Sequence, residues 1–491
     1  MTEIFEVITF SRIMTITYFL NFIISMAIIF LERKNPSATL AWILVLFAVP
    51  IAGIFLYIVF SQNINRYHIF KLSPIEEDAV DRILASQISY MESGEYQFPN
   101  DVTKTWEHMI KLNQTYGQAY LTENNEIELI TDGKQMYHNL MNDIRHAKKS
   151  INVEFFIVRN DIVGKKFIEL LTRKAQEGVE VRFLMDAMGS RMINDYILRD
   201  FAKAGGKYSF FFKPLVKYMF VKFNYRNHRK ITIIDDEIGY IGGFNIGREY
   251  LGYKERFGYW RDTHVRLRGD SIVALNQRFY LDWRYASKEK INLLERCIPN
   301  DYTVGRAMGN NPIQIVSCGP ESRKQEIKQS LLRMVTYAKK NIYIQTPYFV
   351  PDNTLFDTLY MAANSGVDVR IMIPCMPDHP FVYATTLSYV GELLEAGVKV
   401  YIYENGFLHV KTMVVDGEVA TVGSANFDRR SFILNFEANA FVYKKEFAEE
   451  MKKTFEDDIK LSKELTLEDY KNRGVWQSTK ESISRLLSDV L

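Results

Sequence analysis

The sequence has few cysteines and almost no excess of charge of either sign. Its 491 residues include only three cysteines, Cys297, Cys318 and Cys375, an odd number without the spacing of a metal-ligand pair or a redox motif. The sequence therefore supports neither a disulfide framework nor a zinc site, and we expect no metal. Lys and Arg number 61 against 59 Asp and Glu, a formal net charge of +2. This balance gives no overall basic footprint, so we expect no nucleic-acid partner.

The overall composition is that of a globular protein. Hydrophobic residues make up 47% of the chain and charged residues 24%, which excludes a wholly disordered, collagen-like or charge-dominated polypeptide. Length alone suggests about three domains. Averages over the whole chain, however, conceal one segment of a different kind.

Charge is missing from two long stretches near the N-terminus. Residues 13–31 and 37–60 contain no charged side chain, and each reaches the roughly 20 residues that a helix needs to cross the hydrocarbon core of a bilayer. A cleaved signal peptide fits poorly, because no small-residue cleavage site ends the first stretch and a second stretch follows at once. Two buried helices of this length are uncommon in soluble domains. We therefore predict a two-helix transmembrane hairpin within residues 1–62.

Two spans would return both ends of the hairpin to one side of the membrane, so the rest of the chain would be one body tethered at its start. The flanking cations are almost evenly divided between the short loop, with Arg33 and Lys34, and the outer ends, with Arg12, Arg66 and Lys71. On this count we expect a multi-pass membrane protein with its body on the cytoplasmic face.

Beyond a polar segment, residues 63–116, which we interpret as a helical linker, the chain repeats itself. Each repeat follows the order strand, amphipathic helix, strand, helix and further strands, which is typical of an α/β fold with a largely parallel sheet. The sequence thus predicts two duplicated lobes, residues 117–306 and 307–491, packed around a pseudo-two-fold axis where equivalent residues meet. The matching segments are 147–156 with 338–347, 178–185 with 366–373, and 204–207 with 396–399.

The same motif occurs in both lobes with identical spacing. Positions two apart on an extended strand share a face, so the lysine of each motif points the same way as its histidine. Each aspartate falls at a turn, where it is either a hairpin residue or a hydrogen-bonding member of the motif. Recurrence in both lobes argues against histidines that merely fill a core. The motif comprises His228, Lys230, Asp235, Gly243 and Asn245 in the first lobe, and His409, Lys411, Asp416, Ser424 and Asn426 in the second.

Two histidines, two lysines and two asparagines at a lobe interface suit chemistry at phosphorus. One histidine can attack as a nucleophile while the other protonates the leaving group. The lysines, with Asn245 and Asn426, can neutralise and bind an anionic centre, a role that metal ions fill elsewhere. Asp262 and Glu437 are candidates for the carboxylates that fix the imidazole tautomers, the alternative being exposed strand residues.

The duplicated motif resembles that of the phospholipase D superfamily, and the resemblance covers essentially the whole chain. The uncharged N-terminus and several further segments resemble the bacterial cardiolipin synthases in particular. This resemblance implies that two phosphatidylglycerol molecules become cardiolipin and glycerol by exchange of one phosphodiester for another, without ATP or another cofactor. It also implies the bacterial cell membrane as the location and anionic membrane lipid as a partner. The segments are 32–36, 39–42, 227–231, 242–247, 346–351 and 426–431.

The resemblance further implies roles for the motif residues. His228 would form a phosphatidyl-histidine, and His409 would protonate the departing glycerol and then activate the second phosphatidylglycerol; pseudo-symmetry leaves open which histidine attacks. A phospholipase or nuclease of the same superfamily would use the same residues with water as acceptor, although the small net charge counts against a nuclease. A catalytically silent membrane scaffold is an alternative of another class. The phosphate oxygens would be held by Lys230, Lys411, Asn245, Asn426, Gly243 and Ser424.

Two other segments bear on membrane contact. Residues 210–224, an insertion relative to the second lobe, combine aromatic side chains with lysines and are either an interfacial segment or a core-packing insertion. Near the end of the chain, Ile483, Leu486, Leu487 and Val490 fit a helical stripe that we expect to pack onto the body. The sequence leaves the oligomeric state open.

Overall fold

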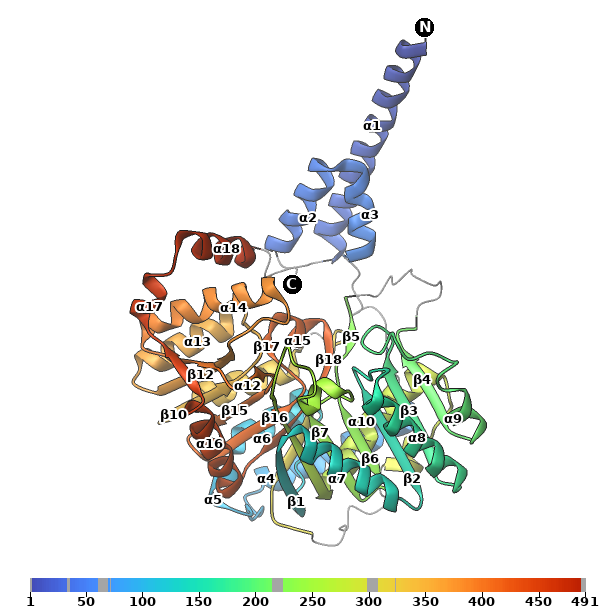
Figure 1. Cartoon of the computed structure of the whole chain (residues 1–491), viewed down its shortest axis with the longest axis vertical. Helices are drawn as coiled ribbons and strands as arrows, with labels where there is room; N and C mark the ends of the chain where they lie inside the picture. The colour runs from blue at the N-terminus through green and yellow to red at the C-terminus, as the bar shows by residue number, and fades with distance from the viewer. Residues whose placement is uncertain are drawn as a thin grey trace. The chain divides into compact units, whose positions relative to one another are not determined.

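The computed structural model of the chain describes residues 2–32, 36–60, 69–70, 72–213, 224–297, 308–322 and 324–486 (Figure 1). The chain divides into two compact units: an N-terminal unit of residues 1–67 and 214–224, and a body that holds the rest. Most of the predicted 210–224 insertion, residues 214–223, lies outside the described residues, as do Leu487 and Val490.

The N-terminal unit contains one helix long and apolar enough to span a membrane. Helix α1 (Thr2–Ala27) continues into the π-helical turn η1 (Ile28–Glu32), and the apolar stretch covers Phe10–Phe30. The second uncharged stretch forms two shorter helices, α2 (Pro36–Ala48) and α3 (Pro50–Phe60). Proline lacks the N–H that would continue α2, and it disfavours the helical conformation at the residue before it. A second continuous span over residues 37–60 is therefore not confirmed.

The first lobe of the body is built on an eight-stranded mixed sheet with the order β1-β8-β7-β6-β2-β3-β4 and a strand of the second lobe added at its side. Its strands are β1 (Asn125–Asp132), β2 (Ser150–Phe155), β3 (Glu180–Asp186), β4 (Lys207–Phe211), β6 (Ile231–Ile234), β7 (Ile238–Gly242) and β8 (Trp260–Gly269). Its helices are α7 (Gly133–His146), α8 (Ile162–Gln176), α9 (Arg199–Lys203), η3 (Arg248–Leu251), α10 (Ser271–Ser287) and α11 (Leu293–Cys297).

The second lobe repeats this plan in a nine-stranded sheet. Its main strands are β9 (Ile313–Cys318), β10 (Asn341–Gln345), β12 (Asp368–Pro374), β13 (Lys399–Tyr403), β15 (Thr412–Val415), β16 (Val419–Gly423), β18 (Asn435–Val442) and β19 (Ser462–Leu465); β11 (Phe349–Val350) and β17 (Phe427–Asp428) form a separate pair. Its helices are α12 (Glu326–Tyr337), α13 (Asn353–Asn364), α14 (Pro380–Leu393), η4 (Leu394–Ala396), α15 (Arg429–Ile433), α16 (Lys445–Ile459), α17 (Leu467–Lys471) and α18 (Val475–Leu486).

The duplicated α/β lobes are confirmed, but each sheet is mixed rather than largely parallel. Strands β2, β3 and β4, like β10, β12 and β13, run parallel, as the repeat pattern predicts. Each histidine motif leads into a β-hairpin, β6–β7 or β15–β16. The first strand of each hairpin pairs antiparallel with β2 or β10, so the other half of each sheet is antiparallel. Every residue of β2 is buried, as expected for a central strand covered on both faces.

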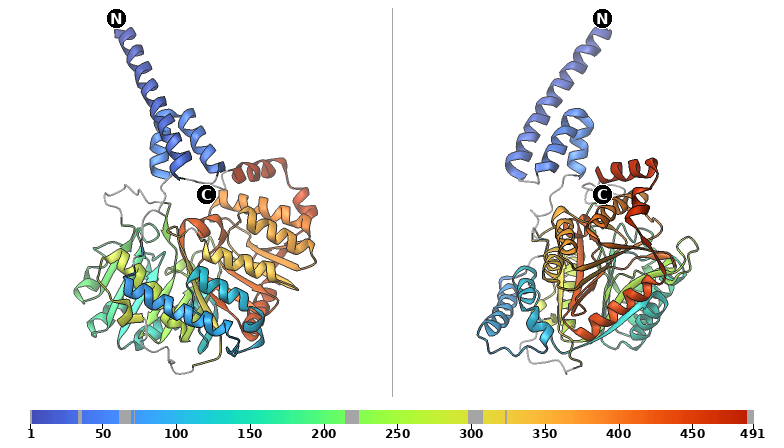
Figure 2. Two further views of the ribbon diagram at one scale, coloured as in Figure 1. Left: turned by 180° about the vertical axis from the view of Figure 1, so that it is seen from behind. Right: turned by 90° about the vertical axis from the view of Figure 1, so that its left-hand side faces the viewer.

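The segment before the first lobe is helical and packs against both lobes. Helices α4 (Pro74–Glu92), α5 (Asp101–Thr105) and α6 (Glu107–Gly117) begin at or near the polar caps Ser73 and Asn100. Trp106 and Ile110 lie in one core cluster with residues of α12 and β9. Figure 2 shows α4 and α6 across the face of the body that Figure 1 hides. The domain boundaries at 116/117 and 306/307 stay predictions.

Helix α18 turns its apolar side chains outward, so the prediction that this stripe packs onto the body is wrong for its two described members. Ile483 is 53% exposed and Leu486 is 83% exposed. The opposite, polar face of α18 is buried instead, at Glu481 and Ser484. Glu481 pairs locally with Arg473 at 2.8 Å, and Arg485 pairs with Glu392 of α14, which joins this face to the body.

Candidate active site

Each motif histidine follows a short strand that pairs with the other lobe. Strand β5 (Arg226–Asn227) runs parallel to β18 of the second lobe, and β14 (Phe407–Leu408) runs parallel to β8 of the first. The N–H of His228 then donates to the carbonyl of Phe436 at 2.9 Å, and that of His409 donates to the carbonyl of Arg261 at 2.7 Å. This exchange of strands brings both histidines to the junction of the two lobes.

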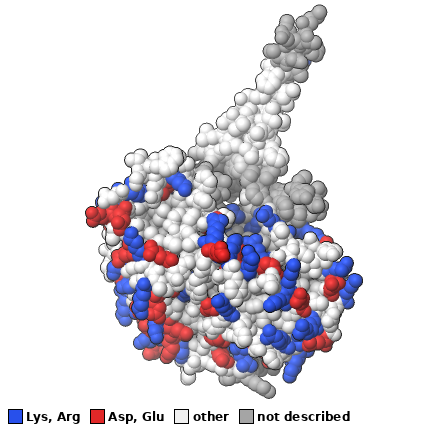
Figure 3. All heavy atoms as spheres, viewed as in Figure 1, with Lys and Arg blue, Asp and Glu red and all other residues white. Residues whose placement is uncertain are grey.

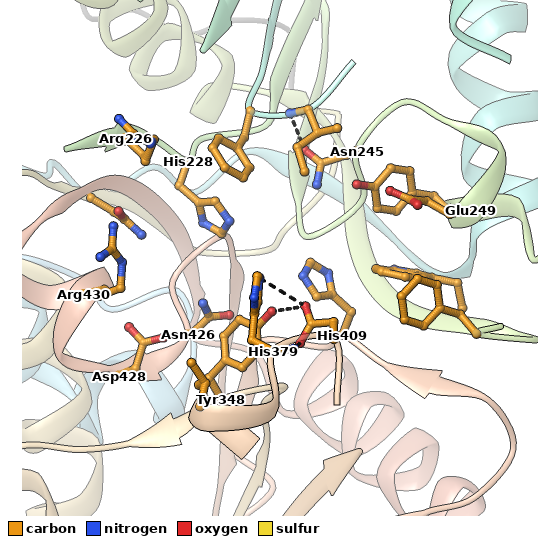
Figure 4. Close-up of a pocket in the computed structure, with 18 of the residues that line it drawn as sticks. Arg226, His228, Asn245, Glu249, Tyr348, His379, His409, Asn426, Asp428 and Arg430 are labelled. Carbon is orange, nitrogen blue, oxygen red and sulfur yellow. Dashed lines mark hydrogen bonds and ion pairs between the residues drawn. The ribbon is translucent and has the colours of Figure 1, made fainter. Parts of the chain in front are cut away.

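A cavity of about 530 Å³ lies at this junction, lined by His228, His409, Asn245 and Asn426 (Figure 4). Its volume is in the usual range of small-molecule sites. The structure thus brings together four of the residues that the duplicated motif predicts. Aromatic and charged side chains complete the wall, among them Phe156, Tyr250, Phe257, Trp260, Tyr348, Arg159, Arg226, Glu249, Lys254, Asp378, Asp428 and Arg430.

Each histidine is held by a buried carboxylate of the other lobe. Nδ1 of His228 lies 3.0 Å from Oε2 of Glu437, and Nδ1 of His409 lies 2.6 Å from Oδ2 of Asp262. An ionised carboxylate can only accept, so Nδ1 carries the proton in each ring and Nε2 is left for chemistry. The structure therefore gives both predicted carboxylates the positions that fix an imidazole tautomer.

The charges around these carboxylates keep them ionised. Burial alone would raise the pKa of Glu437, but His228 and Lys230 outweigh it and hold that pKa below its usual value. The pKa of Asp262 is lowered in the same way, against burial, by Lys411 and His409. Both carboxylates can thus accept from their imidazoles and stabilise positive charge that develops there.

Both histidines are neutral near pH 7 in this structure. Burial lowers the pKa of His228 to about 4, with Lys230 acting in the same direction and Glu437 opposing it. Burial and Lys411 lower the pKa of His409, and Asp262 opposes them. A neutral imidazole with its proton on Nδ1 has a lone pair on Nε2, which is the form that a nucleophile requires.

The two motif lysines are buried but are not among the residues that line the cavity. The ammonium group of Lys230 donates to the carbonyl of His228, and that of Lys411 donates to the carbonyl of His409. Burial lowers the pKa of Lys230 to about 7 and that of Lys411 to about 8, although Glu437 and Asp262 partly oppose it. The lysines thus lie beside the histidines, and their lowered pKa values mean that they lose their positive charge more readily than exposed lysines do.

The two motif asparagines do reach the cavity wall. Oδ1 of Asn245 accepts the N–H of Ile157 at 3.0 Å, so the amide of Asn245 meets the cavity as a donor. Oδ1 of Asn426 is buried and has no hydrogen-bond partner within the described part of the chain. Amide donors at equivalent positions of the two lobes suit an anion bound between them.

Gly243 and Ser424 are not on the cavity wall; they adjoin the two carboxylates. A Cβ at position 243 would lie 2.0 Å from Oδ1 of Asp262, so only glycine leaves room for that carboxylate. At the equivalent position of the second lobe the hydroxyl of Ser424 donates to Glu437. The contacts of this pair support placement of the carboxylates, a role that the sequence did not indicate; the predicted phosphate contact stays a prediction.

Asp235 and Asp416 are not brought to the cavity. Each sits in the turn of its hairpin with a left-handed backbone, φ 55° and 56°. The carboxylate of Asp235 accepts the N–H groups of residues 148–150, and that of Asp416 accepts those of residues 339–341. Of the two roles open from the sequence, these contacts support the structural one. The aspartate side chain joins the turn of the hairpin to the start of β2 in the first lobe and of β10 in the second.

The cavity is symmetric in its histidines and asparagines but not in its charge. Arg226 lies two residues before His228, whereas the equivalent residue of the second lobe is Phe407. Arg430 lies four residues after Asn426, whereas its equivalent is Glu249. Both arginines line the cavity on the same side, as Figure 4 shows. Sequence reasoning missed these residues, and alignment of the two repeats outward from their motifs would have found them.

No group of three or more His, Cys, Asp or Glu side chains that could hold a metal ion occurs among the residues that the structure describes.

Comparison with known proteins identifies relatives of the whole chain. A family model described as a cardiolipin synthase, phospholipase D-like domain matches residues 140–257 and 331–459, and one described as phospholipase D-nuclease N-terminal matches residues 19–62. The major cardiolipin synthase of Bacillus subtilis (strain 168) is 44% identical over 481 residues, 98% of this chain and 99% of its own length. A cardiolipin synthase of Listeria monocytogenes serotype 4a (strain HCC23) is 44% identical over 480 residues, with the same coverage.

A solved structure shares the fold of the body. The phosphatidylserine synthase of Haemophilus influenzae Rd KW20 superimposes with a TM-score of 0.59 at 16% sequence identity, covering 78% of this chain and 97% of that one. At this level of identity the likeness concerns the fold alone.

Proposed function

The chain belongs to the cardiolipin synthase family of phospholipase D-like proteins, and from this premise we propose that it converts two phosphatidylglycerol molecules into cardiolipin and glycerol. It is a phospholipid-modifying transferase. The observation that carries the proposed mechanism is the pair of histidines in one cavity, each with its Nδ1 held by a buried carboxylate.

In the first step Nε2 of His228 attacks the phosphorus of one phosphatidylglycerol. The new N–P bond forms as the bond from phosphorus to the glycerol oxygen breaks, and His409 donates its Nε2 proton to that oxygen. The anionic phosphodiester in the cavity favours the imidazolium form of His409 that this step needs. Glu437 stabilises the positive charge that develops on His228. The products are glycerol and a phosphatidyl-histidine.

In the second step the roles of His409 reverse. Its neutral Nε2 takes the proton from a glycerol hydroxyl of the second phosphatidylglycerol, and that oxygen attacks the phosphorus as the N–P bond to His228 breaks. Cardiolipin leaves, His228 is neutral again and His409 regains its proton. One phosphodiester replaces another, so the exchange needs no ATP or other energy source.

Stabilisation of the phosphate falls to the remaining motif residues. The amides of Asn245 and Asn426 donate to the non-bridging oxygens, and the ammonium groups of Lys230 and Lys411 supply positive charge beside them. As the phosphorus becomes pentacoordinate its oxygens gain negative charge, so groups fixed before the reaction lower its barrier. The exposed part of the arginine-lined wall attracts an anionic headgroup.

The test is incubation of the purified full-length protein and its variants with phosphatidylglycerol. We expect His228→Ala and His409→Ala to lose cardiolipin formation by at least about 10³-fold. His379→Ala is the matched control, because His379 also lines the cavity but belongs to neither motif. Cardiolipin formed at the wild-type rate by either motif variant would overturn the scheme, and phosphatidic acid in place of cardiolipin would assign a hydrolase.

The order of the two histidines has its own test. With phosphatidylglycerol labelled in its phosphate, His409→Ala lacks both the acid of the first step and the base of the second. Label is therefore expected to appear slowly on His228 and then to stay there, because no base activates the second lipid. Label on His409 in the variant His228→Ala would reverse the assignment.

We also propose that the N-terminal unit anchors the protein in the bacterial cell membrane, where anionic lipid is both substrate and surroundings. The support is the 21-residue apolar helix Phe10–Phe30, a length that fits the hydrocarbon core. Apart from residues drawn in grey, the N-terminal unit in Figure 3 has almost no charged surface, whereas both signs of charge cover the body. We expect the full chain to stay in the membrane pellet at alkaline pH; its release would contradict the anchor. The predicted two-span topology with a cytoplasmic body is one form of this anchor.

A further inference from the structure

The second apolar stretch of the N-terminal unit doubles back on itself. The ring centroids of Trp42 in α2 and Tyr57 in α3 are 5.5 Å apart, whereas one continuous helix would separate positions 42 and 57 by about 22 Å. Gly53 lies at the close approach of the two helices, since a Cβ there would be 2.8 Å from the carbonyl oxygen of Val45. Helices α2 and α3 are therefore an antiparallel hairpin whose turn lies at Val49 and Pro50 (Figures 1 and 2).

One polar side chain of α1 meets that turn. The amide of Asn21, which is fully buried, donates to the carbonyl of Leu46 at 2.5 Å and to that of Pro50 at 3.2 Å. In a helix the carbonyl of Leu46 would accept the N–H of residue 50, which proline lacks. Asn21 thus supplies the donor that the turn has lost. In hydrocarbon no water can supply this donor, so a carbonyl left without a partner there is strongly unfavourable.

The buried and exposed faces of α1 and η1 differ in the size and polarity of their side chains, as expected for a helix in lipid. The side chains buried against the hairpin are Thr17, Asn21, Ser25 and Ile28, mostly small or polar and three or four residues apart. Packing of helices in a membrane favours such residues at the contact. The side chains turned outward are large and apolar, among them Phe10, Ile16, Phe19, Phe22 and Phe30. A soluble protein would show the reverse distribution.

The lengths of α2 and α3 limit how deeply the hairpin can enter the bilayer. Helices α2 and α3 have 13 and 11 residues, or about 20 and 17 Å, which is too short for a hydrocarbon core of about 30 Å. Asn21, which contacts the turn, lies near the middle of the apolar stretch Phe10–Phe30. Trp42 and Tyr57 lie toward the open end of the hairpin, and aromatic side chains of this kind are enriched at the membrane–water interface.

We propose that the N-terminal unit crosses the bilayer once, through α1, and that α2 and α3 form a re-entrant hairpin which enters only one leaflet and is held there by Asn21. The chain then leaves α3 on the side from which it entered α2. The N-terminus and the catalytic body consequently lie on opposite sides of the membrane, unlike in the two-span topology, and the hairpin occupies the leaflet that faces the body. The proposal rests on the N-terminal unit alone and not on the catalytic assignment.

The two topologies predict opposite outcomes for tags at the ends of the full-length chain. With one epitope tag before Met1 and another after Leu491, protease added to intact spheroplasts should remove one tag and spare the other, and lysis should expose both. Retained synthesis of cardiolipin in the same membranes shows that the tagged chain is folded. If both tags are removed, or both spared, in intact spheroplasts, the single crossing is excluded.

Cysteine cross-linking tests the hairpin and the role of Asn21. Under mild oxidation Trp42→Cys with Tyr57→Cys should form an intramolecular disulfide, whereas Leu40→Cys with Ile51→Cys, one residue near the open end and one near the turn, should not. Adding Asn21→Leu should lower the yield of the first disulfide several-fold, and adding Ser25→Ala, a change on the same buried face, should leave it unchanged. No disulfide between positions 42 and 57 would overturn the hairpin, and an unchanged yield with Asn21→Leu would overturn the role of Asn21.

Discussion

In the proposed mechanism Glu437 and Asp262 act on the chemistry without touching the substrate, through the single proton on Nδ1 of each histidine. In this geometry a carboxylate forces one tautomer, and an amide in its place can donate to Nδ1 and force the other. The charge of the carboxylate also supports the imidazolium that forms during attack. Both residues are therefore positioning residues whose effect appears in the rate of chemistry rather than in lipid binding.

We predict that Glu437→Gln lowers kcat by about 10²–10⁴-fold with little change in KM, because the glutamine has the size of the glutamate but favours the wrong tautomer of His228. The measurement is cardiolipin formation at several concentrations of phosphatidylglycerol. Ser424→Ala, which removes only one donor to Glu437, should lose less than about tenfold. A purely structural role would instead lower the amount of folded protein and leave the kcat of the remainder intact.

The pH dependence of kcat/KM follows from the lysines. Burial lowers the pKa of Lys230 to about 7, so its positive charge is present below that pH and is lost as the pH rises through it. We predict that kcat/KM falls on the alkaline side from about pH 7–8. Lys230→Arg, which stays charged, should retain activity to higher pH in relative terms, even if its peak rate is lower. An alkaline limb at the same pH in both proteins would contradict this origin.

At the scale of elements, the site depends on how the short strand β14 lies on β8. The turn that precedes β14 contains Gly406, with φ +100°, where a Cβ would lie 2.1 Å from the carbonyl oxygen of Tyr259. That residue is adjacent to β8, the strand that carries Asp262. A displacement here would move His409 away from its carboxylate.

We therefore predict that Gly406→Ala lowers both the thermal midpoint and the rate of cardiolipin formation. Gly397→Ala is the matched control, since Gly397 also has a positive φ, +85°, but nothing within 4 Å of a Cβ. Both variants bear the backbone strain of about 1 kcal/mol, and only the first adds a steric clash. Equal effects of the two substitutions on activity would show that β14 does not need this close approach.

Sequence periodicity was sufficient for elements whose signal is local. The parallel strands, the duplicated lobes and the recurrence of the histidine motif follow from patterns that repeat along the chain. The exchange of β5 and β14 does not, because two-residue strands have no periodicity and their partners are about 210 and about 150 residues away. For the same reason the sequence indicated Asp262 and Glu437 as carboxylates but not which histidine each one holds.

One prediction is not confirmed and another is wrong, for physical reasons that a hydropathy pattern does not contain. The stretch 37–60 is long enough for a span, but Pro50 and the amide of Asn21 make a turn in it possible. In α18 the apolar stripe exists as predicted, yet the ion pair of Arg485 with Glu392 joins the polar face to the body. Both outcomes depend on a partner elsewhere in the chain.

On the scale of the whole molecule, buried neutral histidines make the stability of the body depend on pH. Burial lowers the pKa of His228 to about 4 and that of His264 to about 3, whereas both take up protons near pH 6.5 when the chain is unfolded. Between pH 6.5 and about 4 the unfolded state thus binds more protons, and stability falls as the pH falls.

We predict a loss of about 2–3 kcal/mol per histidine by pH 4.5. The measurement is the thermal midpoint of the full-length protein in detergent between pH 7 and pH 4.5 at one heating rate. In His264→Gln one of these titrations is absent, so the midpoint should fall less steeply with pH than in the wild type. A slope as steep as that of the wild type would assign the acid sensitivity to other groups.

The crossed pairs, His228 with Glu437 and His409 with Asp262, have a consequence for whether either lobe can work alone. A lobe that lost its carboxylate would leave the histidine of the other lobe without its partner, so the two lobes depend on each other at these four positions. Neighbouring residues of the cavity wall are not subject to this constraint, and there the two lobes differ. Arg226 is equivalent to Phe407, and Arg430 is equivalent to Glu249. The two lobes are therefore coupled through their histidines, and the difference in charge between them lies in the surrounding wall of the cavity.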